Sequence, residues 1–144
     1  MKNDYDLFFT CSLIEYIGRA CKLERGEVVN YIGKDYLKRI YKYAGTLHCE
    51  PIEKVADDYI QICNIPQGTY DNVAKCKYDV PDYWTIGDVY GRLIEDIAKG
   101  DVIDTLMKIY QSWISNVISN YNSDFFYQSR EYICKCYEAN EILL

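Results

Sequence analysis

The fold is decided first by residues 6–22, which read DLFFTCSLIEYIGRACK. Apolar residues recur there at steps of three and four, at Leu7, Cys11, Ile14, Ile17 and Cys21. An α-helix needs this period to turn one apolar face toward a core. Asp4 or Asp6 is placed to cap the first turn. The stretch therefore predicts an amphipathic helix at the start of the chain.

The same period continues through most of the chain, so we expect an all-α bundle of six or seven helices. Glycine and proline mark many of the predicted ends, since they stop or start a helix well. Further helices are expected at 27–32 ending at Gly33, at 34–44 ending at Gly45, from Pro51 to Pro66, at 84–99 ending at Gly100, at 101–120, and at 124–141 capped by Ser123. Gly87 and Gly91, four residues apart, indicate a close helix-packing surface.

Residues 66–83 are the exception, because no helical period persists there. Turn residues such as Asp71 and Asn72 alternate with larger residues such as Tyr70 and Val73 that can anchor the segment. Such anchors indicate an ordered connection rather than a domain boundary. We therefore expect residues 1–144 to form a single helical domain.

The composition is that of an ordinary globular domain, with 49% hydrophobic and 26% charged residues among 144. No stretch approaches the roughly 18 apolar residues of a membrane span, and the first residues carry no signal-peptide pattern. The seven cysteines are odd in number and irregularly spaced, which favours reduced, mostly buried thiols over disulfides. These features predict a cytoplasmic protein without membrane contact.

The net charge of −6 is unevenly distributed. Residues 1–44 hold eight Lys and Arg against six Asp and Glu, whereas residues 45–144 hold eight against sixteen. An acidic majority disfavours broad contact with nucleic-acid phosphates and suits a basic partner, or simply solubility. Sixteen tyrosines are the other unusual feature. Tyr is enriched at protein interfaces, but a Tyr-rich core explains the count equally well.

Chemical motifs are scarce in this sequence. His48 is the only histidine, and its neighbour Cys49 is poorly placed to act with it, because adjacent residues seldom face each other as a nucleophile and its base must. Cys134 and Cys136 point to different faces of a helix, and no C-x-x-C pair occurs. Nucleotide-binding and hydrolase signatures are also missing. We therefore expect no metal, no cofactor and no assignable catalytic residue.

Two segments carry a resemblance to a known family. The first reads YAGTLHCE at 43–50 and continues as VADDYI at 55–60, and the second reads YWTIGDVYGRLI at 83–94. They resemble an uncharacterised family of small helical domains from gut Firmicutes, and the likeness covers roughly residues 6–98. Some members are encoded beside ADP-ribosyltransferase-like toxins, so the resemblance implies an antitoxin or partner role. The family has no assigned catalytic residues, and none is carried over.

The sequence predicts a non-enzymatic protein-binding module. It would act as an antitoxin or as an inhibitor of a partner, such as a toxin or nuclease, in a bacterial or phage conflict system. Its binding face is expected around the irregular connection, where aromatic and acidic residues gather, because binding residues often lie on such segments. The candidate binding residues are Tyr78, Asp82, Tyr83, Trp84, Asp88 and Tyr90.

Two alternatives stay open at this point. One is a small enzyme whose pocket is built from scattered residues, with Asp57, Asp58, His48 and Arg92 as candidates. The other is a DNA-binding regulator that uses residues 22–42, which hold six Lys and Arg and two short predicted helices joined by a glycine. Acidic residues within 22–42 weaken this second interpretation.

Overall fold

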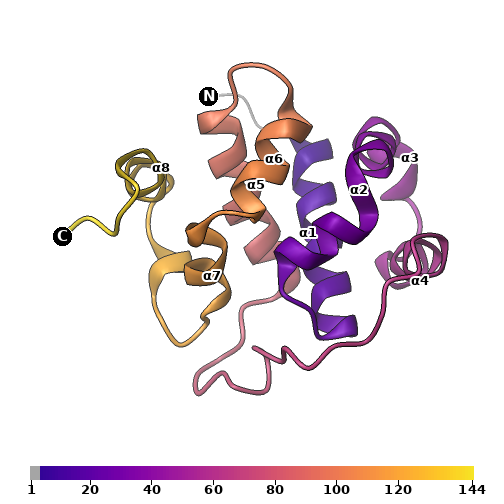
Figure 1. Cartoon of the computed structure of the whole chain (residues 1–144), viewed down its shortest axis with the longest axis horizontal. Coiled ribbons are helices and arrows are strands. Elements are labelled where there is room, and N and C mark those ends of the chain that lie inside the picture. The colour runs from indigo at the N-terminus through magenta and orange to yellow at the C-terminus, as the bar shows by residue number, and fades with distance from the viewer. Residues whose placement is uncertain (1–3) are drawn as a thin grey trace.

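The structure is a computed structural model, and it describes residues 4–144. Those residues contain no β-strand, which confirms the predicted all-α class. The elements are α1 (Tyr5–Cys21), α2 (Arg25–Lys42), α3 (Ala44–Leu47), α4 (Ile52–Ile62), α5 (Tyr83–Ile97), α6 (Val102–Tyr110), α7 (Trp113–Ser119), a 3₁₀ helix η1 (Phe125–Tyr127) and α8 (Arg130–Ala139) (Figure 1). Their number exceeds the six or seven expected because several helix boundaries differ from the predicted ones.

Helix α1 lies inside the bundle and packs against α2, α4 and α5 (Figure 1). Eleven of its 17 residues are buried. The predicted apolar stripe belongs to this buried set, but Phe9, Leu13 and Glu15 on other faces of the helix are buried as well. A single stripe describes a helix that covers a core from one side. Because α1 has neighbouring helices on several sides, more of its residues are buried than the apolar stripe in its sequence indicates.

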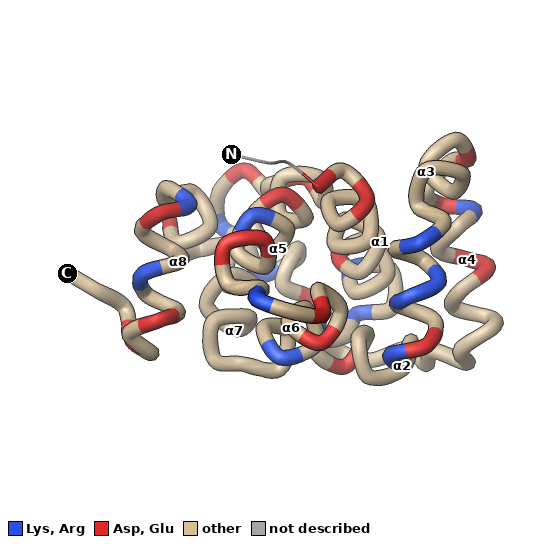
Figure 2. Tube along the Cα trace, turned by 90° about the horizontal axis from the view of Figure 1, so that it is seen from above, with Lys and Arg blue, Asp and Glu red and all other residues tan. Residues whose placement is uncertain are grey.

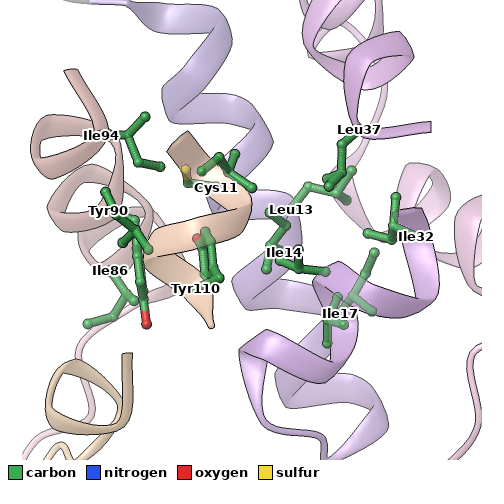
Figure 3. Close-up of a cluster of buried hydrophobic side chains, with 14 of the residues drawn as sticks. Cys11, Leu13, Ile14, Ile17, Ile32, Leu37, Ile86, Tyr90, Ile94 and Tyr110 are labelled. Atoms are coloured by element: carbon green, nitrogen blue, oxygen red, sulfur yellow. The ribbon is translucent and has the colours of Figure 1, made fainter. Parts of the chain in front are cut away.

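The core collects apolar side chains from α1, α2, α5 and α6 (Figure 3). Leu13 and Ile14 of α1 extend into the space between α2 and the α5–α6 pair (Figure 3). Tyr90 of α5 and Tyr110 of α6 stack there, with ring centroids 4.0 Å apart. The Tyr90 hydroxyl shares a hydrogen bond of 2.7 Å with Ser115 Oγ, so its polar tip is satisfied. Part of the tyrosine enrichment thus belongs to the core.

Helices α1 and α5 pack closely and run antiparallel, as the two glycines of α5 show. A Cβ at position 87 would lie 2.7 Å from the backbone nitrogen of Ser12, so only glycine permits this approach. A Cβ at position 91 would lie 3.7 Å from the Cα of Phe8, which is ordinary contact. The predicted packing surface at Gly87 and Gly91 is confirmed, with the tightest approach at Gly87.

Several helix ends follow the sequence. Asp4 caps α1, because its Oδ1 accepts from the backbone N–H of Leu7 at 3.0 Å. Asp101 caps α6 by accepting from the N–H of Ile103 at 2.9 Å. Gly33 kinks α2 where a boundary is predicted, with φ 79° and ψ 164°, a conformation that favours glycine. Local sequence chemistry therefore sets these ends.

Three predicted boundaries are wrong. The helix expected at 101–120 divides into α6 and α7, because Ser112 is extended and begins a new helix. The helix expected at 124–141 begins only at Arg130, since η1 precedes it and Ser129, not Ser123, accepts the capping hydrogen bond. Gly45 lies inside the short α3 instead of ending the helix before it.

The irregular connection between α4 and α5 is fixed to the bundle by a buried polar network. Arg25, at the start of α2, donates to both carboxylate oxygens of Glu15 at 3.0 Å and to Asn72 Oδ1 at 2.9 Å. Asn72 in turn donates to the carbonyl of Ser119 at 2.9 Å. All four residues are buried. Asn72 of the connection is thus bonded to α2 and α7 and is linked through Arg25 to Glu15 of α1, as expected of an ordered connection.

Two further expectations from the sequence concern the state of the cysteines and the possibility of a membrane span. All seven cysteines are free. Only Cys11, Cys21 and Cys136 are fully buried, and Cys49 is exposed, so the set is less buried than predicted. Burial raises the pKa of the Cys11 thiol to about 12 and keeps it protonated. Within residues 4–144, no helix combines the length and apolarity that crossing a bilayer requires.

Candidate functional site

The predicted binding residues lie at and before the start of α5. Asp82 caps this helix, because its Oδ1 accepts from the backbone N–H of Thr85 at 2.7 Å. Trp84 and Asp88 are half-buried on the first turns. The capping hydrogen bond places Asp82 beside these two side chains and leaves its second carboxylate oxygen for other contacts.

The predicted tyrosines separate into three environments. Tyr78 is 71% exposed, whereas Tyr83 is half-buried and packs edge-on against Tyr16, with ring centroids 5.2 Å apart. Tyr90 is fully buried and its hydroxyl is engaged by Ser115, so it cannot meet a partner. The expectation for Tyr90 is corrected, because its position on the apolar stripe of α5 turns it inward.

Three of the predicted residues line one open groove, which we call the α1–α5 groove. It lies between the first turns of α1 and the outward face of α5, and its volume is about 410 Å³. The lining residues are Asp4, Tyr5, Phe8, Asp82, Trp84, Thr85, Asp88, Gly91, Arg92 and Glu95. The groove therefore follows α5 from its N-cap almost to its last turn.

Aromatic rings form the apolar part of this groove. The rings of Phe8 and Trp84 are stacked, with centroids 5.4 Å apart and an interplanar angle of 27°. Tyr83 supports the indole of Trp84 from a centroid distance of 5.0 Å. Gly91 carries no side chain to cover Phe8, which keeps this part of the groove open. A ligand in the groove would therefore contact aromatic surface.

Four carboxylates and one guanidinium surround the aromatic rings. Arg92 Nη2 lies 3.1 Å from Asp88 Oδ2, and both side chains are about half exposed. Glu95 accepts from Arg130 of α8 at 3.3 Å. These contacts leave the groove with more negative than positive charge, and Figure 2 shows Asp and Glu around α5 and the start of α1.

The other two carboxylates of the groove are helix caps. Asp4 accepts from Leu7 N–H and also from the hydroxyl of Tyr41. Among residues 4–144, Asp82 accepts from one backbone N–H, that of Thr85. No cation among residues 4–144 forms an ion pair with either Asp4 or Asp82. The positive ends of the two helices offset part of their charge.

Two more hollows continue this surface. The α5–α8 groove, about 170 Å³, lies across a ridge of Thr85, Asp88 and Arg92 that lines both grooves. A third hollow of about 530 Å³ shares Phe126 and Tyr127 with the α5–α8 groove and extends to residues 78–79. Because each hollow shares residues with the next, we treat the three as one surface, the acidic aromatic face.

The three most exposed tyrosines of residues 4–144 all lie on the acidic aromatic face. Tyr127 is 83% exposed, Tyr5 is 76% exposed and Tyr78 is 71% exposed. Sequence reasoning found only Tyr78. Tyr5 and Tyr127 are large aromatic residues outside every predicted apolar stripe, and that signal could have pointed to them. Exposed aromatic surface gathered on one face is typical of interaction sites.

The buried network around Glu15 has a structural role. Burial raises the pKa of Glu15, but the neighbouring Arg25 and Arg19 outweigh it, so the pKa falls below its usual range. Burial likewise raises the pKa of Tyr121, whose hydroxyl donates to Glu15, to about 12. Arg19 also donates to the carbonyl of Pro81 at 2.6 Å. The network therefore holds an ionised carboxylate in place and fixes the chain just before α5.

The structure does not bring the four enzyme candidates together. Arg92 lines the α1–α5 and α5–α8 grooves, and neither groove includes His48, Asp57 or Asp58. His48 follows α3, the two aspartates lie on α4, and all four side chains are exposed. Asp58 pairs with Lys54 at 3.3 Å. The scattered residues form no common pocket on which acid–base chemistry could be argued.

The basic segment at residues 22–42 is largely neutralised by carboxylates. Arg25 is buried against Glu15, and Lys22 lies 3.8 Å from an oxygen of Asp71. Lys34 and Lys38 pair with carboxylates of the α5–α6 corner, at 2.6 and 3.7 Å. Four of the six cations therefore already have acidic partners. This arrangement lowers the net positive charge that the segment presents, with Arg25 alone buried in its ion pair.

A metal site is also not assembled in the part of the chain that the structure describes. No three His, Cys, Asp or Glu side chains there are grouped to hold an ion. The groups that line the three hollows can make aromatic contacts, donate hydrogen bonds from tyrosine hydroxyls and attract positive charge. Comparisons with known protein families, with curated proteins and with solved structures find no match for this chain.

Proposed function

We propose that this chain is a non-enzymatic protein-binding module that holds a partner protein on its acidic aromatic face. The observation that carries the proposal is that the three most exposed tyrosines of residues 4–144, Tyr5, Tyr78 and Tyr127, all line the connected hollows of that face. Folding gains little from side chains left this exposed, whereas a partner that covers them buries large aromatic area.

The shape of the face also suits a protein partner. A site for a small molecule is usually one concave pocket that covers most of its ligand. Here three open hollows of about 170 to 530 Å³ succeed one another around α5, η1 and the connection. Exposed aromatic residues ringed by polar groups are the usual composition of a protein interface.

The partner that we propose is a toxin or nuclease of a bacterial or phage conflict system, which the chain inhibits in the manner of an antitoxin. This part of the proposal rests on the resemblance of residues 43–60 and 83–94 to helical domains encoded beside toxins. It also rests on the acidic excess of residues 45–144, which suits a partner with a basic functional surface. We place the complex in the cytoplasm.

Affinity purification from the native host tests the proposal. The wild-type chain is compared with a triple variant, Tyr5→Ala, Tyr78→Ala and Tyr127→Ala, and with a control, Tyr31→Ala and Tyr43→Ala. The control residues are 44% and 50% exposed and line none of the three hollows.

We expect one protein to be recovered in near-stoichiometric yield by the wild type and the control, and to be lost with the triple variant. At about 1 kcal/mol or more for each interface tyrosine, the triple variant loses at least about 100-fold in affinity. A partner that the triple variant retains, or no stoichiometric partner at all, contradicts the proposal. Thermal unfolding of each variant shows whether it is folded.

A further inference from the structure

Resting on the proposed function, we infer that the α1–α5 groove recognises an extended basic segment of the partner and that Arg92 competes with that segment for the groove. The groove combines an aromatic pair, Phe8 and Trp84, with carboxylates at both of its ends and in its middle. Positive charge on a side chain with an apolar stem fits both components.

The length of the groove selects an extended segment. Its lining residues on α5 run from Asp82 to Glu95, which spans about 20 Å at the helical rise. About six residues of extended chain cover that length. Carboxylates lie at each end, with Asp82 at the start of α5 and Asp4 and Glu95 at the other end. A segment with several basic residues can therefore pair at more than one point.

The charge of the groove is incompletely neutralised within the chain. Asp88 and Glu95 have arginine partners, but Asp4 and Asp82 have none among residues 4–144. Asp82 uses Oδ1 for its cap, so Oδ2 can accept from an incoming cation. Asp4 is half-buried, so nearby apolar surface limits screening of its charge by water, whereas Asp82 is exposed and its attraction for a cation is more strongly screened.

Arg92 already occupies the place of such a cation. It lines the groove from the ridge that the two grooves share, with Nη2 3.1 Å from Asp88 Oδ2, and this exposed contact is the one ion pair that it makes among residues 4–144. An exposed pair of this kind is weak and is readily exchanged. A basic side chain from the partner can therefore take over Asp88 while Arg92 moves into solvent. Removal of Arg92 is expected to strengthen binding, which a purely structural role would not produce.

The test is a binding titration with a defined probe. The probe is a capped, fluorescein-labelled peptide of about six residues that alternates arginine and serine. A second peptide carries citrulline in place of arginine, which keeps the shape and removes the charge. Binding is followed by fluorescence anisotropy for each variant. In a Trp113→Phe background, Trp84 is the only tryptophan, and its emission reports whether the probe reaches the groove.

Charge-matched variants separate the groove from bulk attraction to an acidic protein. Arg92→Gln is compared with Arg39→Gln, an exposed change on α2 outside the groove. Asp82→Asn, which keeps a capping side chain, is compared with Asp58→Asn on α4. We expect Arg92→Gln to tighten arginine-peptide binding about two- to fivefold and Asp82→Asn to weaken it by a similar factor. The two controls should change it by less than about 1.5-fold.

The inference is overturned if the citrulline peptide binds as well as the arginine peptide, or if Arg92→Gln has no more effect than Arg39→Gln. It is also overturned if the arginine peptide fails to change Trp84 emission. These failures leave the proposed function standing when the native partner is still lost with the tyrosine triple variant. If that variant retains the partner while the peptide results hold, the proposed function fails and the cation site survives.

Discussion

Replacement of Arg25 by methionine is expected to destabilise this chain more than any surface substitution. Arg25 is buried and makes a bidentate contact with Glu15, with both N–O distances at 3.0 Å. It also donates to the carbonyl of Leu23 at 2.6 Å and to Asn72 at 2.9 Å. Methionine fills much of the same volume but supplies none of these donors, so the carboxylate loses its main partner in a buried site.

The expected cost follows from the environment of Glu15. Removal of one member of a buried ion pair typically costs about 3–5 kcal/mol, because the remaining charge is left without compensation. Arg19 stays within 2.9 Å of Glu15 and retains part of the compensation. We therefore expect a loss of about 3 kcal/mol, near the lower end of that range. The total free energy of unfolding of a domain of this size is about 5–15 kcal/mol.

Urea unfolding followed by far-ultraviolet circular dichroism measures this loss, provided that the slope of the transition is unchanged. The double variant Glu15→Leu with Arg25→Met removes both charges together. It should be more stable than the sum of the two single losses predicts, by about 1–3 kcal/mol. A single-variant cost below about 1 kcal/mol, or two strictly additive losses, refutes the argument that Glu15 depends on Arg25.

Three further predictions can be checked by the same unfolding measurement. Gly87→Ala should lower the free energy of unfolding by at least about 2 kcal/mol, because its Cβ would press on the backbone of α1. Gly91→Ala should leave that free energy unchanged or raise it by up to about 1 kcal/mol. Equal effects of the two substitutions would contradict the packing of α1 on α5. Tyr110→Phe should leave stability unchanged within about 0.5 kcal/mol, since the buried Tyr110 hydroxyl has only the Cys11 thiol, a weak partner, beside it among the described residues. Tyr90→Phe should cost about 1 kcal/mol because it removes the hydrogen bond to Ser115, and the reverse order would refute this. Arg25 and Arg19 outweigh burial and hold the pKa of Glu15 below its ordinary value of 4.5. The contribution of ionised Glu15 to the free energy of unfolding should therefore be complete above pH 4.5 and be lost as the pH falls through the lowered pKa. A Glu15→Gln variant that loses the same free energy of unfolding in acid would rule out this assignment.

The sequence predicts the helices well where the apolar period and a cap agree. Asp4, one of the two expected cap candidates, caps α1. Helix α6 begins directly after Asp101, where a helix start is expected, and Gly33 breaks α2 at the expected place. Prediction fails where the apolar period runs through a break. Residues 101–120 keep a helical pattern across Ser112, so the change of direction between α6 and α7 has no sequence signal of its own.

The candidate site is predicted only in part, for a related reason. Asp82, Trp84 and Asp88 are close in sequence, and a single helix is enough to bring them to one groove. Tyr5 and Tyr127 reach the same face from opposite ends of the chain, which requires the packing of α1, α5 and η1. Local pattern contains no information on that packing. Tyrosine as a residue type suggests an interface, but Tyr90 lies on the face of α5 that turns toward the core and is therefore buried.

The buried network also bears on how the proposed site works. Arg19 donates to the carbonyl of Pro81, which directly precedes the cap residue Asp82, while it also contacts Glu15. The start of α5, and with it one end of the α1–α5 groove, is therefore fixed from the interior of the bundle. A groove held in this way needs little ordering when a partner binds, and preorganisation of this kind improves affinity without any additional contact. The irregular connection thus serves the acidic aromatic face in two ways, by contributing Tyr78 and by fixing the start of α5. Arg19→Met should therefore weaken partner binding although this residue lines none of the three hollows.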